Sequence, residues 1–157
     1  MNTRHIFFEE LDKIMAKDKD VMFLTGDLGY SYMENIQKKY PEQFINCGCI
    51  EQSMIGIAVG LAMMGKKPYV YSTVPFLLYR PAEQVRDDVA QKPFNIKLIG
   101  VSMSGFLGYT HNPLHPKEDI NFCKNIGLKY HIPKTLKAIS DIIKKTYKSK
   151  ENCYIRL

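Results

Sequence analysis

Residues 44–65 place a single acid inside an otherwise apolar strand–turn–helix pattern. Residues 44–47 form a short apolar run that is typical of a buried strand, and a turn follows. A helix is predicted next, because apolar residues recur at helical spacing: Met54, Ile55, Ala58, Leu61 and Ala62. Gly65 and Pro68 end this helix. Glu51 therefore stands between strand and helix, where the amides of a helix N-terminus favour negative charge.

Strand patterns alternate with helix patterns along the rest of the chain. Apolar runs predict strands at 21–25, 68–73, 95–101, 128–132 and 153–157. Helical periodicity predicts helices at 3–17, 82–91, 117–125 and 134–148, with a short helix ending near Tyr40. Thr3 is the expected N-cap of the first helix. We expect one doubly wound α/β domain over residues 1–157, with a mostly parallel sheet and helices on both faces.

Polar, glycine-bearing segments follow four of the predicted strands, at 26–31, 47–51, 72–80 and 102–115. In such sheets ligands bind at the carboxyl ends of the strands. These segments should therefore converge on one edge of the sheet. The side chains expected to share one cleft there are Asp27, Ser31, Glu51, Arg80 and His111.

The composition excludes several classes of protein. The net charge of +6 comes from lysine clusters on predicted exposed faces, without the interleaved aromatic residues typical of nucleic-acid binding. A basic balance suits small anionic substrates. No apolar run is long enough to cross a bilayer, and residues 1–5 lead into a helix pattern without a signal-peptide segment. Four cysteines without a CxxC pair fit reduced thiols, so we expect a cytoplasmic protein without a metal site of its own.

Five ordered blocks of residues resemble one family. Residues 44–52, Phe-Ile-Asn-Cys-Gly-Cys-Ile-Glu-Gln, and the following glycine-rich helix resemble the cofactor helix of transketolases and 1-deoxyxylulose-5-phosphate synthases. The other blocks are Gly26-Asp-Leu28 with Ser31, Tyr71-Ser-Thr73, Arg80-Pro-Ala-Glu-Gln-Val-Arg86 and Gly108-Tyr-Thr-His111. The resemblance covers nearly the whole chain, and it is to the pyrimidine-binding domain of these thiamine diphosphate enzymes.

The resemblance implies a split enzyme. In the family, a Gly-Asp-Gly…Asn motif on another domain holds the diphosphate through Mg²⁺, and this sequence lacks that motif. A separate diphosphate-binding chain would then carry the Mg²⁺ ligands, and the complex would be a dimer of heterodimers. The cofactor helix lies at the dimer core in this family, which suits its small residues; tight packing on its own sheet explains them equally well. These residues are Gly56, Ala58, Gly60 and Ala62.

The resemblance also implies roles for single residues. Glu51 would hydrogen-bond N1′ of the aminopyrimidine and so activate the cofactor. Asp27, Ile50 and Phe76 would contact the cofactor, although an ordinary turn acid explains Asp27 equally well. The substrate contacts would come from Ser31, Arg80 and His111, with His111 also catalytic; a surface ion pair is the alternative for Arg80.

Some positions depart from the family pattern. In the family an aromatic residue directly follows Ser-Thr, whereas here Val74 and Pro75 come first and the aromatic residue is Phe76. Near the substrate, Met103, Leu107 and Asn112 replace the residues that are usual in the family. A non-standard sugar is therefore plausible.

We expect the pyrimidine-binding subunit of a transketolase-like enzyme that transfers a two-carbon ketol unit between sugar phosphates or related aldehydes. One alternative is a β-type subunit of a 2-oxo acid decarboxylase or dehydrogenase, against which His111 argues. The other alternative is a non-catalytic binding or regulatory module that lost its partner.

Overall fold

The computed structural model describes residues 2–101 and 117–157. In this part of the chain, six strands form one sheet in the order β2-β1-β3-β4-β6-β5, and all five pairings are parallel. The strands are β1 (Val21–Thr25), β2 (Phe44–Asn46), β3 (Lys67–Thr73), β4 (Lys97–Val101), β5 (Lys129–His131) and β6 (Cys153–Arg156). Parallel neighbours need crossover connections, which the alternating helices supply.

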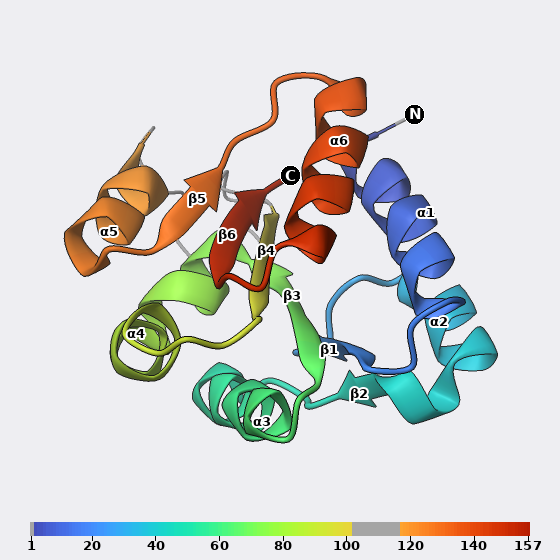
Figure 1. Cartoon of the computed structure of the whole chain (residues 1–157), viewed down its shortest axis with the longest axis horizontal. Coiled ribbons are helices and arrows are strands. Elements are labelled where there is room, and N and C mark those ends of the chain that lie inside the picture. The colour runs from blue at the N-terminus through green and yellow to red at the C-terminus, as the bar shows by residue number, and fades with distance from the viewer. Residues whose placement is uncertain (1, 102–116) are drawn as a thin grey trace.

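Helices cover both faces of the sheet. Figure 1 shows α1 (Thr3–Met15), α2 (Met33–Lys39) and α6 (Leu136–Lys148) on one side, and α3 (Glu51–Met63), α4 (Ala82–Gln84) and α5 (Glu118–Ile126) on the other. A 3₁₀ turn (Pro41–Gln43) precedes β2, and π-helical turns (Pro75–Tyr79 and Val85–Ala90) flank α4. The α/β architecture predicted from the sequence is confirmed.

Successive side chains of the central strands point to opposite faces of the sheet, and they form a hydrophobic core on each face. Phe23 and Tyr71 pack beneath α1, where the ring of Phe7 stacks on Tyr71 with 6.0 Å between centroids. Leu24 and Val70 point the other way, into the core beneath α3. Because both faces are buried in this way, a ligand has access to the central strands mainly at their ends.

The structure corrects three local expectations. Asn2, rather than Thr3, caps α1, because its Oδ1 accepts the backbone N–H of His5 at 3.0 Å. Residues 75–79, predicted as loop, form a π-helical turn with Pro75 at its first position, where the missing N–H of proline costs nothing. Strand β2 is only partly buried because it lies at the edge of the sheet.

Candidate functional site

The candidate site lies between β1 and β3, at the point of the sheet where the strand order reverses. Strand β1 pairs with β2 on one side and with β3 on the other, so the connections leaving β1 and β3 diverge at their carboxyl ends. Such a point in a parallel sheet opens a crevice for a ligand. The loop after β2 turns at Gly48, whose φ of +73° suits glycine, and then delivers Glu51 as the first residue of α3.

Glu51 is buried at this edge, with only 3% of its side chain exposed. Gly26, directly after β1, lies against this site: a Cβ at Gly26 would crowd the Gly48 carbonyl oxygen at 3.2 Å and would lie in ordinary contact with Glu51 Oε1 at 3.7 Å. The carboxylate also lies in the first turn of α3, whose N-cap residue, Ile50, supplies no side-chain cap. The helix N-terminus favours the negative charge there.

The other carboxylate oxygen of Glu51 meets Arg80, which the π-helical turn after β3 presents. Arg80 Nη1 donates to Glu51 Oε2 at 3.0 Å. The Arg80 guanidinium also lies over the ring of Phe76, with Cζ 3.5 Å from the ring centroid. The structure thus brings together three of the predicted site residues. The cavity beside them measures about 430 Å³ and is lined by Cys49, Ile50, Glu51, Gln52, Ser53 and Arg80.

Asp27 organises the neighbouring loop. Its carboxylate accepts a hydrogen bond from the Tyr30 hydroxyl at 2.5 Å and one from Asn46 Nδ2 at 3.2 Å, and these bonds hold the pKa of Asp27 below its usual range. Asn46 Oδ1 in turn accepts the backbone N–H groups of Asp27 and Gly48. Asn46 therefore ties the β1 loop to the β2 loop. It is a positioning residue that the sequence analysis missed, and its place at the end of a strand was the only signal.

The expectation that Ser31 shares the cleft of Glu51 is not met. Ser31 lines a separate cavity of about 230 Å³ between α1 and α2, and its backbone N–H donates to Glu34 Oε1. The reason is local: Ser31 adopts a φ of +72°, next to the start of α2. His111 lies outside the described residues, as do Met103, Leu107 and Asn112.

The arrangement fits a planar, nitrogen-bearing heterocycle. Glu51 offers a buried carboxylate. Phe76 offers a ring face that already accepts a planar group, because the Arg80 guanidinium lies over it with Cζ 3.5 Å from the ring centroid. At the end of β3, the buried hydroxyls of Ser72 and Thr73 have no hydrogen-bond partner among residues 2–101 and 117–157. Buried hydroxyls are normally paired. Within the described part of the chain, the hydroxyls of Ser72 and Thr73 are therefore an exception to this rule at the carboxyl end of β3.

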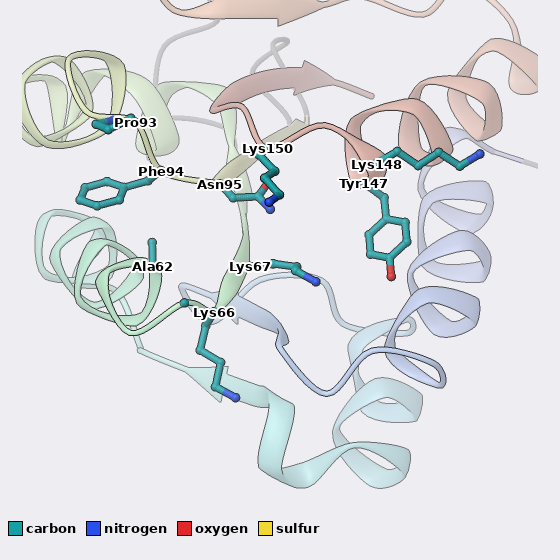
Figure 2. Close-up of a pocket in the computed structure, with 10 residues that line it drawn as sticks. Ala62, Lys66, Lys67, Pro93, Phe94, Asn95, Tyr147, Lys148 and Lys150 are labelled. Carbon is teal, nitrogen blue, oxygen red and sulfur yellow. The ribbon is translucent and has the colours of Figure 1, made fainter.

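A larger cavity lies at the opposite edge of the sheet. It measures about 650 Å³ and opens beside the start of β3 and the end of α6, and Figure 2 shows Lys66, Lys67, Asn95 and Lys150 among the side chains that line it. Lys66 pairs with Asp20 at 2.9 Å, and Lys67 pairs with Asp18 at 2.6 Å. These ion pairs neutralise part of the positive charge of the lysines that line the cavity. The cavity lies at the amino ends of the strands, far from the predicted ligand edge.

Two kinds of feature are missing from the described part of the chain. Residues 2–101 and 117–157 contain no group of three or more His, Cys, Asp or Glu side chains placed to hold a metal ion. The same residues contain no helix that is both long and apolar enough to span a membrane.

The parallel sheet, the carboxyl-edge crevice and the buried acid that pairs with Arg80 define an α/β domain with a candidate ligand site at its sheet edge. Comparison with known families makes this class specific. The family model for the transketolase pyrimidine binding domain matches residues 1–157, and the chain belongs to this family. The resemblance found in the residue blocks is thereby confirmed. Enzymes of this family depend on thiamine diphosphate.

Known relatives include subunits of transketolases. The chain is 33% identical to a subunit of the apulose-4-phosphate transketolase of Phocaeicola vulgatus, over 98% of this chain and 50% of that protein. It is 32% identical to a 6-deoxy-6-sulfo-D-fructose transketolase subunit of a Clostridium species, over 78% of this chain and 36% of that protein. A solved structure described as a split gene transketolase, inactive beta4 tetramer, matches with a TM-score of 0.85 and 25% identity, over 99% of this chain and 50% of that one. The chain thus spans half or less of the length of these relatives.

Proposed function

We propose that this chain is the pyrimidine-binding subunit of a two-chain, thiamine diphosphate-dependent transketolase-like enzyme. The reaction would transfer a two-carbon ketol unit between sugar phosphates or related aldehydes. The observation that carries the proposal is the burial of Glu51 at the carboxyl edge of the sheet, where Arg80 contacts both Glu51 and the Phe76 ring, in a member of this family. Relatives named as transketolase subunits support the division of the enzyme between two chains.

The residues of this chain would hold the pyrimidine end of the cofactor. Glu51 would bind N1′ of the aminopyrimidine and share a proton with it, in a position from which the sheet edge excludes water. Phe76 and Ile50 would pack on the cofactor, and Asp27 would fix the loop beside it. When bound, thiamine diphosphate supplies an electron sink for the carbanion that forms when a ketol unit is transferred.

The remaining roles fall on the substrate side and on the partner. Arg80 and His111 would contact the sugar phosphate, and the ligands of Mg²⁺ would lie on the diphosphate-binding chain. The proposal places the enzyme in the cytoplasm, where the four cysteines, which are free thiols in this structure, stay reduced.

The first test measures where the cofactor binds. Thiamine diphosphate with Mg²⁺ should bind the isolated chain at least about 100-fold more weakly than the co-purified two-chain complex, because half of its contacts are missing. Isothermal titration calorimetry measures both affinities. Equal, tight binding by the isolated chain contradicts the split site. A complex that binds no cofactor, or that transfers no ketol unit from a panel of ketose donors, contradicts the proposed function.

The outer face of α3 supports the proposal of a dimer of heterodimers. Gly56 and Gly60 are exposed, and a Cβ added at either would meet nothing within 4 Å. Ile57 and Met63 are exposed on the same helix, at 38% and 72%. Ala58, which was expected to share the small-residue face, instead packs into the core beneath α3. A helix with this flat, partly apolar face suits a second copy of the helix across a dimer axis.

Substitution at Gly60 tests this assembly. Gly60→Gln should leave the chain folded, because the added side chain has open space and replaces a poor helix former. It should halve the mass of the two-chain complex, because the longer side chain keeps the facing helices apart. Light scattering after size exclusion measures the mass, with Lys137→Gln on α6 as the matched control. An unchanged mass for Gly60→Gln rules this face out as the dimer contact.

A further inference from the structure

Arg80 makes, in this structure, the two contacts that a planar nitrogen heterocycle would make at the same place. Its Nη1 donates to Glu51 Oε2 at 3.0 Å, and its Cζ lies 3.5 Å from the centroid of Phe76. A separation of 3.5 Å is the contact distance between stacked planar groups. The guanidinium therefore fills the space over that face of the ring, and a second planar group cannot lie there at the same time.

The environment of the two partners explains why arginine suits this position. The Glu51 side chain is 3% exposed, whereas the Arg80 side chain is 45% exposed. A buried carboxylate without a partner is costly. Arginine offers a planar, delocalised cation that both bonds a carboxylate and stacks on an aromatic face. Arg80 thus neutralises the Glu51 carboxylate from the solvent side, while the Arg80 side chain itself stays partly exposed to solvent.

The backbone of Arg80 is fixed, so only the side chain can move aside. The Arg80 N–H donates to the Pro75 carbonyl oxygen at 3.3 Å, at the end of the π-helical turn, and Pro81 follows. The long side chain can rotate away from Glu51 without moving this turn. Released arginine at the mouth of the cavity would present its N–H fork to an anion.

We propose that Arg80 is a placeholder for the aminopyrimidine ring. In the cofactor-free protein its guanidinium is hydrogen-bonded to Glu51 and lies over the Phe76 ring. It must give up both contacts before the cofactor binds. The released guanidinium then becomes available to the anionic group of the substrate. Cofactor binding therefore precedes the completion of the substrate site. This inference rests on the proposed function, because it takes thiamine diphosphate as the ligand of Glu51.

The test compares cofactor binding in variants of the two-chain complex. Arg80→Ala removes two contacts that compete with the cofactor, the ion pair of the partly exposed Arg80 with Glu51 and the cation–π contact with Phe76. It should therefore tighten binding of thiamine diphosphate with Mg²⁺ by about 3- to 10-fold. Arg80→Lys keeps a charge but loses the planar fork, so its gain should be smaller. The matched control is Arg86→Ala, since Arg86 is exposed and pairs with Asp87. Its affinity should equal that of the unaltered complex.

Turnover separates the placeholder role from a purely structural one. Arg80→Ala should raise KM for a phosphorylated ketose while its cofactor affinity improves, whereas a structural defect would weaken both. Cofactor affinity that is unchanged or weaker in Arg80→Ala overturns the inference. If the unaltered complex binds no cofactor, the proposed function fails instead, so the two failures are distinguishable.

A measurement on the unaltered complex covers the case in which Arg80→Ala does not fold. The Nε–Hε resonance of Arg80, assigned by its loss in Arg80→Lys, should shift when thiamine diphosphate saturates the site, because the guanidinium leaves Glu51 and the Phe76 ring. An Arg80 resonance that does not move on saturation overturns the placeholder role.

Discussion

Glu51→Gln should reduce ketol transfer by the two-chain complex by about 10²- to 10³-fold, the range expected when a positioned proton-sharing group is removed. The amide has nearly the same shape as the acid, but it cannot share a proton with a ring nitrogen. The variant should fold normally, because the amide oxygen can still accept the hydrogen bond of Arg80 Nη1. Steady-state turnover with a ketose donor measures the loss, and thermal unfolding monitors the fold.

A matched control separates the role of Glu51 from a general effect of losing one negative charge. Glu83 lies exposed on α4, a few residues beyond Arg80. Glu83→Gln should keep full turnover. Near wild-type turnover in Glu51→Gln would remove Glu51 from the mechanism, while a comparable loss in both variants would point to an electrostatic effect of the whole surface.

The fold was predictable because each element carries its own pattern. Strands such as β1 are uninterrupted apolar runs, and α3 has helical apolar spacing that ends at a glycine. The position of Glu51 followed from the same patterns, since an acid between a strand and a helix in a parallel sheet must lie at the ligand edge. Residue types in order were therefore sufficient for the architecture and for the position of Glu51 at the edge of the sheet.

The side-chain pairings were not predictable in the same way. Arg80 and Glu51 are 29 positions apart, and their segments predicted a shared edge of the sheet but not the ion pair between the two side chains. Ser31 illustrates the opposite case: its segment belongs to the ligand edge, but a positive φ and the start of α2 turn it toward α1. Such contacts depend on loop geometry, which residue patterns constrain weakly.

Asp119 is the clearest buried polar residue that the sequence did not reveal. As an acid in the first turn of α5 it resembles an ordinary exposed helix-start residue, yet it is completely buried. Its Oδ2 accepts a hydrogen bond from the Tyr154 hydroxyl at 2.7 Å, and Arg156 Nη1 donates to its Oδ1 at 3.0 Å. Burial and the Asp119 carboxylate raise the pKa of Tyr154 well above its usual value, so the hydroxyl stays protonated and donates. The cluster holds α5 onto the end of β6.

Neighbouring packing leaves this cluster little room to rearrange. The Tyr154 ring crosses β4 at Gly100, where an added Cβ would lie 2.6 Å from Tyr154 Cε2 and 2.9 Å from Val74 Cγ2. The Tyr154 hydroxyl therefore cannot turn easily toward another acceptor. Loss of Asp119 would leave this hydroxyl buried without its acceptor, and it would remove the carboxylate that faces the Arg156 charge. Removing one partner of a buried ion pair is strongly destabilising, because the other partner stays in place.

Asp119→Ala should accordingly lower the free energy of unfolding by about 2–4 kcal/mol, toward the lower end of the range for breaking a buried pair because the Arg156 side chain keeps 22% exposure. Asp119→Asn should lose less, since its amide oxygen can still accept from Tyr154. The chain has no tryptophan, so urea unfolding is followed by circular dichroism, with the exposed Asp141→Ala on α6 as control. A loss in Asp119→Ala no larger than that of the Asp141 variant would show that the cluster contributes no net stability, and the anchoring of α5 would then rest on its apolar contacts, Cys123 and Ile126.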